Sequence, residues 1–312
     1  MLEQLADQIR NAPGLQSKRD LAILSHLPGP RDGDDAAVIE RDGEFLLLCG
    51  EAIAPALVES DPFAAGAAAV VTNVSDIRAM GGRPLGLVDM LVSPDRAHAE
   101  AVLDGIAWAA GLLGVDVVGG HLTIGHPAAL SASCTGIARR PLRAANARPG
   151  DRILAALCLE GRAREGQNGY IFTSLRDRDP RRLRDDGEAL VEVAECGLCT
   201  AARDISMPGA AGSLLQLLEA AGAGATLDVE RLPRPPGIEL PRWLLTFPSF
   251  GFLLTARPEL AEQAAEPFTR RGLACADCGV VDDSHTLRIA SGDETALVWD
   301  LAREPLTAPA AR

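Results

Sequence analysis

The stretch that decides the fold is Asn73-Val74-Ser75-Asp76-Ile77-Arg78-Ala79-Met80-Gly81-Gly82-Arg83-Pro84. It ends an Ala- and Val-rich run that begins at Pro62, and its two glycines close that run, so the pattern predicts a helix over residues 62–80. Three polar residues, Asn73, Ser75 and Asp76, interrupt the otherwise apolar helix. A buried polar group without a partner costs about 2–7 kcal/mol. The three side chains therefore either line a cavity or form a solvated helix end.

Strands and helices alternate on both sides of this stretch. We expect strands at 36–39, 45–49, 85–92, 116–118 and 130–138 and a helix at 97–113, with the first two strands joined by the turn Arg41-Asp42-Gly43. A hairpin combined with strand-helix-strand units predicts an α+β, or mixed α/β, fold and not a doubly wound sheet.

The turn-rich segment 147–151 predicts a domain boundary near residue 147. We therefore expect an N-terminal helical segment (1–30, broken at Pro13-Gly14), a first domain (31–146), a second domain (147–303) and a disordered tail (304–312). The second domain is expected to contain a strand at 152–159, a mobile charged segment at 161–187, helices at 209–221 and 260–271, a strand at 250–255 and a final hairpin of 279–281 with 287–289.

Composition restricts the function. The chain has 312 residues, of which 47% are hydrophobic, so it can bury two ordinary cores. A net charge of −13 argues against nucleic-acid and anionic-membrane surfaces, which need clustered Lys and Arg. With neither a signal-peptide pattern nor a long apolar run, and with an odd count of seven cysteines, we expect a cytoplasmic protein that acts on small molecules.

Two acidic motifs lie at strand ends. In Gly33-Asp34-Asp35, adjacent side chains point to opposite faces, so one Asp faces a ligand while the other holds the loop; the alternative is an ordinary surface turn. Asp204 ends a strand before a glycine-containing loop and a helix start, which suits a metal carboxylate beside a phosphate site. A simple Asp N-cap is the alternative for that residue.

The pair Gly119-Gly120, followed by His121, ends an apolar strand. Two glycines let backbone N–H groups approach phosphate oxygens, although Gly-Gly is also a common turn.

The cysteines offer a different interpretation. Cys196-x-x-Cys199 and Cys275-x-x-Cys278 have the spacing of tetrahedral zinc ligands. Their long separation and their apolar neighbours favour packed thiols instead.

Taken in order, these motifs resemble the aminoimidazole-ribonucleotide-synthetase (AIR synthase) superfamily, which includes selenophosphate synthetase, thiamine-monophosphate kinase and the hydrogenase-maturation carbamoyl dehydratase. The wording is most similar to that of selenophosphate synthetase: Asp-Asp-Ala-Ala-Val at 34–38, Asp61-Pro62-Phe63 with Gly66, Asn73-x-Ser75-Asp76, Ala79-Met80-Gly81-Gly82-x-Pro84 and Val118-Gly119-Gly120-His121. The resemblance covers residues 30 to 290.

The resemblance implies a two-domain protomer whose first domain pairs with that of a second copy into a dimeric β-barrel, with ATP and Mg²⁺ as cofactors. It implies a metal site of Asp35, Asp76 and Asp204, and an ATP site of Asp34, Asp35, Glu51, Asn73, Asp76, Gly119, Gly120, His121 and Lys18. Several carboxylates suit a triphosphate, because hard cations prefer oxygen ligands.

Two residues depart from the family pattern. Glu51 stands where the family has Asp, which shifts the metal position by one methylene. No Cys precedes Asp34, whereas selenophosphate synthetases have a reactive Cys or selenocysteine followed closely by Lys; here Lys18 is the only lysine. We therefore expect an ATP- and Mg²⁺-dependent enzyme of a separate subfamily, a kinase, cyclo-ligase or dehydratase acting on a small substrate. Selenophosphate synthesis and catalytically silent ATP binding are the alternatives.

Overall fold

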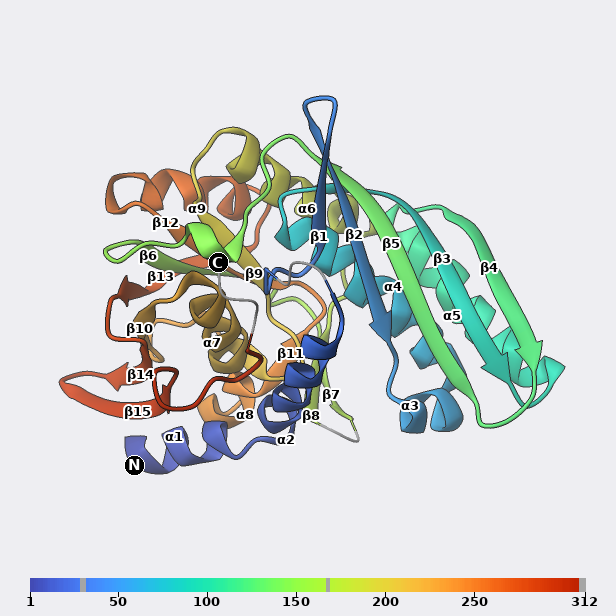
Figure 1. Cartoon of the computed structure of the whole chain (residues 1–312), viewed down its shortest axis with the longest axis horizontal. Helices are drawn as coiled ribbons and strands as arrows, with labels where there is room; N and C mark the ends of the chain where they lie inside the picture. Colours follow the sequence, from blue (N-terminus) through green and yellow to red (C-terminus); the bar gives the residue numbers. More distant parts are fainter. Residues whose placement is uncertain (29–31, 167–168, 309–312) are drawn as a thin grey trace. The chain divides into compact units, whose positions relative to one another are not determined.

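The computed structural model describes residues 1–28, 32–166 and 169–308. The chain divides into two compact units (Figure 1). One contains residues 35–141 and 178–191, and we call it the inner unit. The other, the outer unit, contains residues 1–34, 142–177 and 192–312. The N-terminal segment thus belongs to the same unit as most of the second half, while 178–191 belongs with the first half. Within the described residues, no helix has the length and apolar character needed to cross a membrane.

The inner unit is a five-stranded sheet with the order β1-β2-β5-β3-β4. Its elements are β1 (Ala37–Arg41), β2 (Glu44–Ala52), α3 (Pro55–Ser60), α4 (Pro62–Ala79), β3 (Arg83–Ser93), α5 (Arg96–Leu113), β4 (Val117–Ile124) and β5 (Ala129–Ala138). Only β3 and β4 pair in parallel. The predicted mixed α/β character is confirmed.

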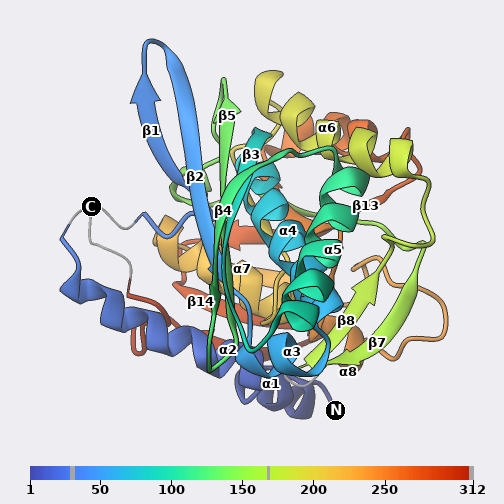
Figure 2. The same ribbon diagram turned by 90° about the vertical axis from the view of Figure 1, so that its right-hand side faces the viewer.

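Helices α4 and α5 lie on one face of this sheet (Figure 2). They can approach closely because each carries a glycine at the crossing: a Cβ on Gly66 would lie 2.0 Å from the carbonyl oxygen of Val102, and one on Gly105 would lie 2.0 Å from that of Phe63. Alternate residues of β3, Leu87 and Leu91, point to the covered face and are buried. This packing fixes α4, and with it Asp76, against the sheet.

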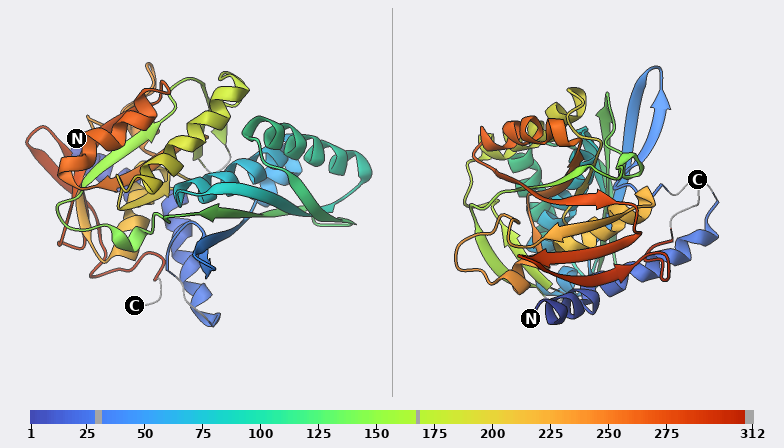
Figure 3. Two further views of the ribbon diagram at one scale, coloured as in Figure 1. Left: turned by 90° about the horizontal axis from the view of Figure 1, so that it is seen from above. Right: turned by 90° about the vertical axis from the view of Figure 1, so that its left-hand side faces the viewer.

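The outer unit has a seven-stranded sheet with the order β15-β14-β10-β13-β6-β12-β9, whose strands adjoin in Figure 3, right. The strands are β6 (Arg152–Leu157), β9 (Ala201–Asp204), β10 (Gly224–Asp228), β12 (Gly251–Ala256), β13 (Ala274–Asp282), β14 (Thr286–Ser291) and β15 (Glu294–Asp300). A second sheet joins β11 (Thr246–Pro248), β8 (Gly169–Thr173) and β7 (Arg162–Gly166). The helices of two turns or more in this unit are α1 (Leu2–Arg10), η1 (Ser17–His26), α7 (Gly209–Ala221) and α9 (Ala261–Thr269). Most of α6 (Pro180–Glu195) belongs to the inner unit. Shorter ones are α2 (Pro13–Gln16), η2 (Ala144–Asn146), α8 (Leu240–Leu244) and η3 (Pro258–Leu260).

The predicted final hairpin is wrong. β13 and β14 are consecutive in the chain but do not pair, because β10 lies between them, antiparallel to β13 and parallel to β14. The last hairpin is instead β14 with β15. Such a pairing joins residues far apart in the chain, and local sequence patterns do not encode it.

Two segments predicted to be mobile or disordered are structured in part. Residues 161–187 contain β7, β8 and the start of α6, and Arg178 forms a buried two-bond ion pair with Asp186 at 2.5 and 2.8 Å. In the tail, Leu306 is buried, and the backbone N–H groups of Leu306 and Thr307 donate to the carboxylate of Glu219 at 2.6 and 2.8 Å. The remainder of the predicted disordered tail, residues 309–312, lies outside the described residues.

Candidate nucleotide and metal site

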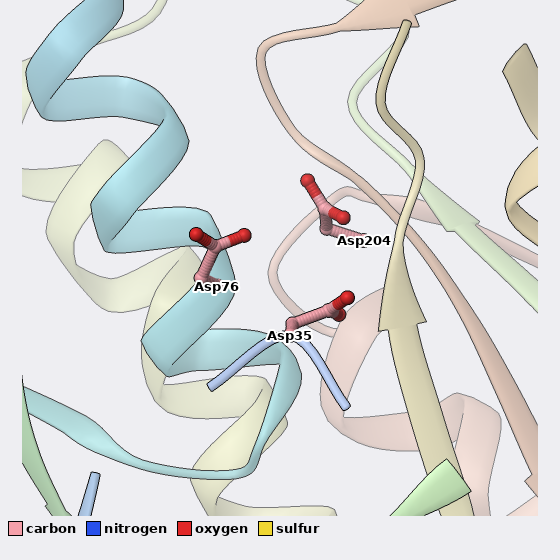
Figure 4. A group of neighbouring side chains, drawn as sticks. All are labelled: Asp35, Asp76 and Asp204. Carbon is pink, nitrogen blue, oxygen red and sulfur yellow. The ribbon is translucent and has the colours of Figure 1, made fainter. Parts of the chain in front are cut away.

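The centre of the candidate site is a pair of carboxylates in the inner unit. Asp76 lies in the last turn of α4 and is 7% exposed, and Asp35 lies directly before β1. Oxygens of the two carboxylates lie within 4.8 Å of each other. Figure 4 draws both with Asp204, which belongs to the outer unit at the end of β9. Two carboxylates held this close repel each other, and a hard divalent cation between them relieves that repulsion.

Asn73 lies beneath this pair, one turn before Asp76, and it is fully buried. Its amide nitrogen donates to the carbonyl oxygen of Ala69 at 2.8 Å, and its side-chain oxygen accepts from the Cys49 thiol at 3.4 Å. Burial, followed by the nearby charge of Asp76, raises the pKa of Cys49, so this thiol stays protonated and able to donate. These contacts engage both ends of the Asn73 amide inside the protein, a geometry that suits a residue orienting the last turns of α4.

Asp34 and Asp35 both lie before the start of β1. An oxygen of Asp34 accepts from the backbone N–H of Ala144 at 2.7 Å, so this residue holds the loop within the outer unit. Just before it, the carbonyl oxygen of Gly33 accepts from the guanidinium of Arg203 at 2.7 Å. Arg203 and Asp204 are neighbours on β9, where both are buried. The chain therefore leaves the outer unit beside β9 and continues directly into Asp35.

Gly119 and Gly120 do not form the predicted loop. β4 runs without a break through both glycines and His121 as an edge strand of the sheet. Gly120 is paired with Asp89 of β3, and His121 with Met90. Since Leu91 points to the face covered by helices, Met90 and His121 point to the opposite, exposed face.

The two residues that depart from the family pattern lie in different units. Glu51 is exposed near the end of β2, on the strand that also carries Cys49. Lys18 lies on η1 of the outer unit and is half-buried. Their predicted roles toward ATP stay predictions.

Family models match both halves of the chain. Residues 33–138 match the N-terminal domain of AIR synthase related proteins, and residues 164–291 match the C-terminal domain. The chain belongs to the AIR synthase related family. The resemblance inferred from the motif string is thereby confirmed, and so is the two-domain AIR synthase-like fold.

Several proteins and solved structures are similar to this chain. A Synechocystis protein is 35% identical over 318 residues, which cover 98% of each chain. A selenide, water dikinase of Myxococcus xanthus is 31% identical, over 66% of this chain and 61% of its own. Among solved structures, PurL of Thermotoga maritima complexed with ATP has a TM-score of 0.79 at 21% identity, covering 94% of this chain and 50% of its own. AaThiL complexed with AMPPCP and TMP has a TM-score of 0.67 at 20% identity, covering 87% and 93%. The chain thus spans about half the length of PurL.

Sequence reasoning missed two charged residues of this family member's inner unit. Arg78, two residues after Asp76, is buried, and burial lowers its pKa to about 10 against the raising influence of Asp186 and Glu188. A Cβ on Gly187 would lie 2.2 Å from the Nε atom of Arg78, so the start of α6 packs on the guanidinium because residue 187 is a glycine. The second missed residue is Asp89, which is 6% exposed. The sequence could have revealed it, because Asp89 is a charged residue at a position of β3 where the alternating pattern places buried apolar residues.

Among the described residues, none of the four cysteines considered as zinc ligands belongs to a group of three or more side chains that could hold a metal ion. The thiol of Cys278 donates to the carbonyl oxygen of Ile153 at 3.5 Å, and burial raises the pKa values of Cys275 and Cys278 to about 12. Burial also raises the pKa of Cys199, whereas Cys196 is exposed.

Proposed function

We propose that the chain binds ATP with Mg²⁺ at Asp35 and Asp76 and uses the nucleotide to activate a small substrate by phosphoryl transfer. The observation that carries the proposal is that oxygens of Asp35, in the loop before β1, and of Asp76, in the last turn of α4, lie within 4.8 Å of each other. The donor set fits the metal, because Mg²⁺ takes carboxylate oxygens together with phosphate oxygens and water. The relatives add support: PurL was solved with ATP, and AaThiL with AMPPCP.

Asp204 is the third metal ligand in this proposal. Its support is the path of the chain, because Arg203 binds the carbonyl oxygen of Gly33 two residues before Asp35. Consecutive Cα atoms are about 3.8 Å apart, so the anchored loop tethers Asp35 close to β9. When bound, the metal supplies charge neutralisation for the transferred phosphoryl group. The protein's own contribution is to position the carboxylates: α4 presents Asp76, and the anchored loop presents Asp35.

A homodimer is part of the same proposal. The face of the inner sheet that lies opposite α4 and α5 exposes large apolar side chains, among them Leu48 (44%) and Met90 (43%). Exposed apolar side chains gathered on one face of a sheet suit an interaction site, and in this proposal a second copy of the chain covers them in a symmetric pair. His121 lies on this face, so its side chain faces the second copy in the proposed dimer.

ATP turnover tests the proposal. The protein is incubated with Mg²⁺-ATP and a small-molecule metabolite extract, and ADP and AMP are measured. A kinase or cyclo-ligase releases ADP, whereas a selenophosphate-type reaction releases AMP. Nucleotide binding with neither product, in any extract fraction, favours the catalytically silent alternative. Loss of turnover in Asp204→Asn, with the protein still folded, supports the third ligand.

A further inference from the structure

Asp89 is a buried carboxylate in the middle of the inner sheet. It lies on β3 between β5 and the edge strand β4, and only 6% of its surface is exposed. Like Leu87 and Leu91, two residues before and after it, Asp89 points to the face that α4 and α5 cover. Its neighbours along the strand are therefore core residues, and the carboxylate is the exception.

No counter-charge accompanies this carboxylate. Burial raises the pKa of Asp89, and the only opposing influence is a hydrogen bond from its own backbone N–H. Throughout the described residues, no Arg, Lys or His side chain forms an ion pair with Asp89, and it belongs to no group of three metal-ligating side chains. Buried carboxylates are normally paired, and one that is not is typical of a ligand site.

The side chain of Asp89 leans toward β4. A Cβ added to Gly120 would lie 2.2 Å from the Oδ1 atom of Asp89, so the carboxylate fills the place of the missing side chain. Every residue of β4 is exposed, which leaves this edge open to a ligand. A phosphate group at the same place would meet an uncompensated negative charge, whereas a neutral hydrogen-bond donor would be attracted.

We propose that Asp89 accepts a hydrogen bond from a neutral donor of the nucleoside, either a ribose hydroxyl or the exocyclic amino group, so that β4 at Gly120 holds the nucleoside and not the phosphates. This inference rests on the proposed ATP site. The Cys49 thiol connects this part of the sheet to the metal site, because it lies 3.4 Å from the side-chain oxygen of Asn73, one turn before Asp76, and 3.7 Å from the carbonyl oxygen of Cys134. Cys134 is paired with Leu87, so Asp89 is one strand across and two residues along from it, on the order of 8 Å.

Calorimetric titration with Mg²⁺-AMPPCP tests the inference on the wild type, on Asp89→Asn and on a matched control, Asp104→Asn, which changes an exposed carboxylate of α5. Asp89→Asn replaces a charged acceptor by a neutral one, which predicts about 5- to 12-fold weaker binding by the variant and no change in the control. Tripolyphosphate with Mg²⁺, which lacks the nucleoside, is expected to bind all three proteins equally.

Analogues distinguish the two donors. The inosine analogue lacks the amino group, and the 2′-deoxy and 3′-deoxy analogues lack one hydroxyl each. The analogue without the contacted donor binds the wild type at least tenfold more weakly than the parent nucleotide, and Asp89→Asn discriminates against it less strongly because its acceptor is neutral. If the variant does not fold, the affinities of the wild type for the parent nucleotide and for the analogues still test the inference.

Three results overturn the inference: full affinity in Asp89→Asn, equal weakening of tripolyphosphate binding, or equal wild-type affinity for every analogue. A wild type that binds no Mg²⁺-AMPPCP at all refutes the proposed function instead, so the two failures are distinguishable.

Discussion

Asp76→Asn removes one charge of the carboxylate pair and is expected to stabilise the metal-free protein. Two unit charges 4.8 Å apart repel each other by about 0.9 kcal/mol at the dielectric constant of water and by about 3.5 kcal/mol at an effective value of 20. Asp76 is buried and Asp35 is half-buried, so we expect a gain of about 1–3 kcal/mol in the free energy of unfolding. The same change removes a metal ligand, and the stabilisation by Mg²⁺-AMPPCP is expected to disappear.

Scanning calorimetry in EDTA and in Mg²⁺-AMPPCP measures both effects. The wild type is expected to melt at a higher temperature with the nucleotide, because a ligand that binds only the folded state stabilises it by mass action. Asp76→Asn is expected to melt above the wild type in EDTA and to show no response to the nucleotide, while Asp104→Asn behaves as the wild type. A variant that is less stable in EDTA and still responds to Mg²⁺-AMPPCP would refute the reasoning.

Four further predictions concern packing, the tail, pH and zinc. Gly105→Ala places a methyl group 2.0 Å from the carbonyl oxygen of Phe63 and should lower the unfolding free energy in urea by about 1–3 kcal/mol; an unchanged midpoint contradicts the packing of α4 on α5. Glu219→Ala should speed amide hydrogen exchange at Leu306 and Thr307, because their N–H groups donate to the Glu219 carboxylate. Unaltered exchange rates would show that this carboxylate does not hold the tail. Because burial raises the pKa of Asp89 above 3.8, its ionisation destabilises the folded state as pH rises through that window. The melting temperature of Asp89→Asn should therefore exceed that of the wild type by a margin that grows above about pH 4, and a constant margin would contradict the raised pKa. Elemental analysis of purified protein should find no stoichiometric zinc, whereas one zinc per chain would restore the cysteine site.

Local sequence patterns predicted the helices and strands whose bounds depend on residues close together in the chain. α4 and β5 lie within one or two residues of their expected bounds, because apolar periodicity and flanking glycines record them in the sequence. The continuation of β4 through Gly119-Gly120 was not predictable in this way. It depends on pairing with β3, in which Gly120 lies opposite Asp89 and His121 opposite Met90.

The motif string located the carboxylates but not the groups that position them. Asp35 and Asp76 follow from the family wording, yet the anchoring of their loop by Arg203 joins residues 170 positions apart. The same holds for Arg78, whose packing partner Gly187 lies in the segment expected to be mobile. Contacts of this length depend on the folded chain, and a single sequence carries no record of them.

The most direct test of the ATP site is calorimetric titration of the wild type with AMPPCP in Mg²⁺ and again in EDTA, repeated with Asp35→Asn. The account predicts saturable binding at one site per chain that requires Mg²⁺ and that is lost or at least tenfold weaker in the variant. Binding of equal strength in EDTA, or in Asp35→Asn, would contradict the claim that this carboxylate pair holds the metal and the nucleotide.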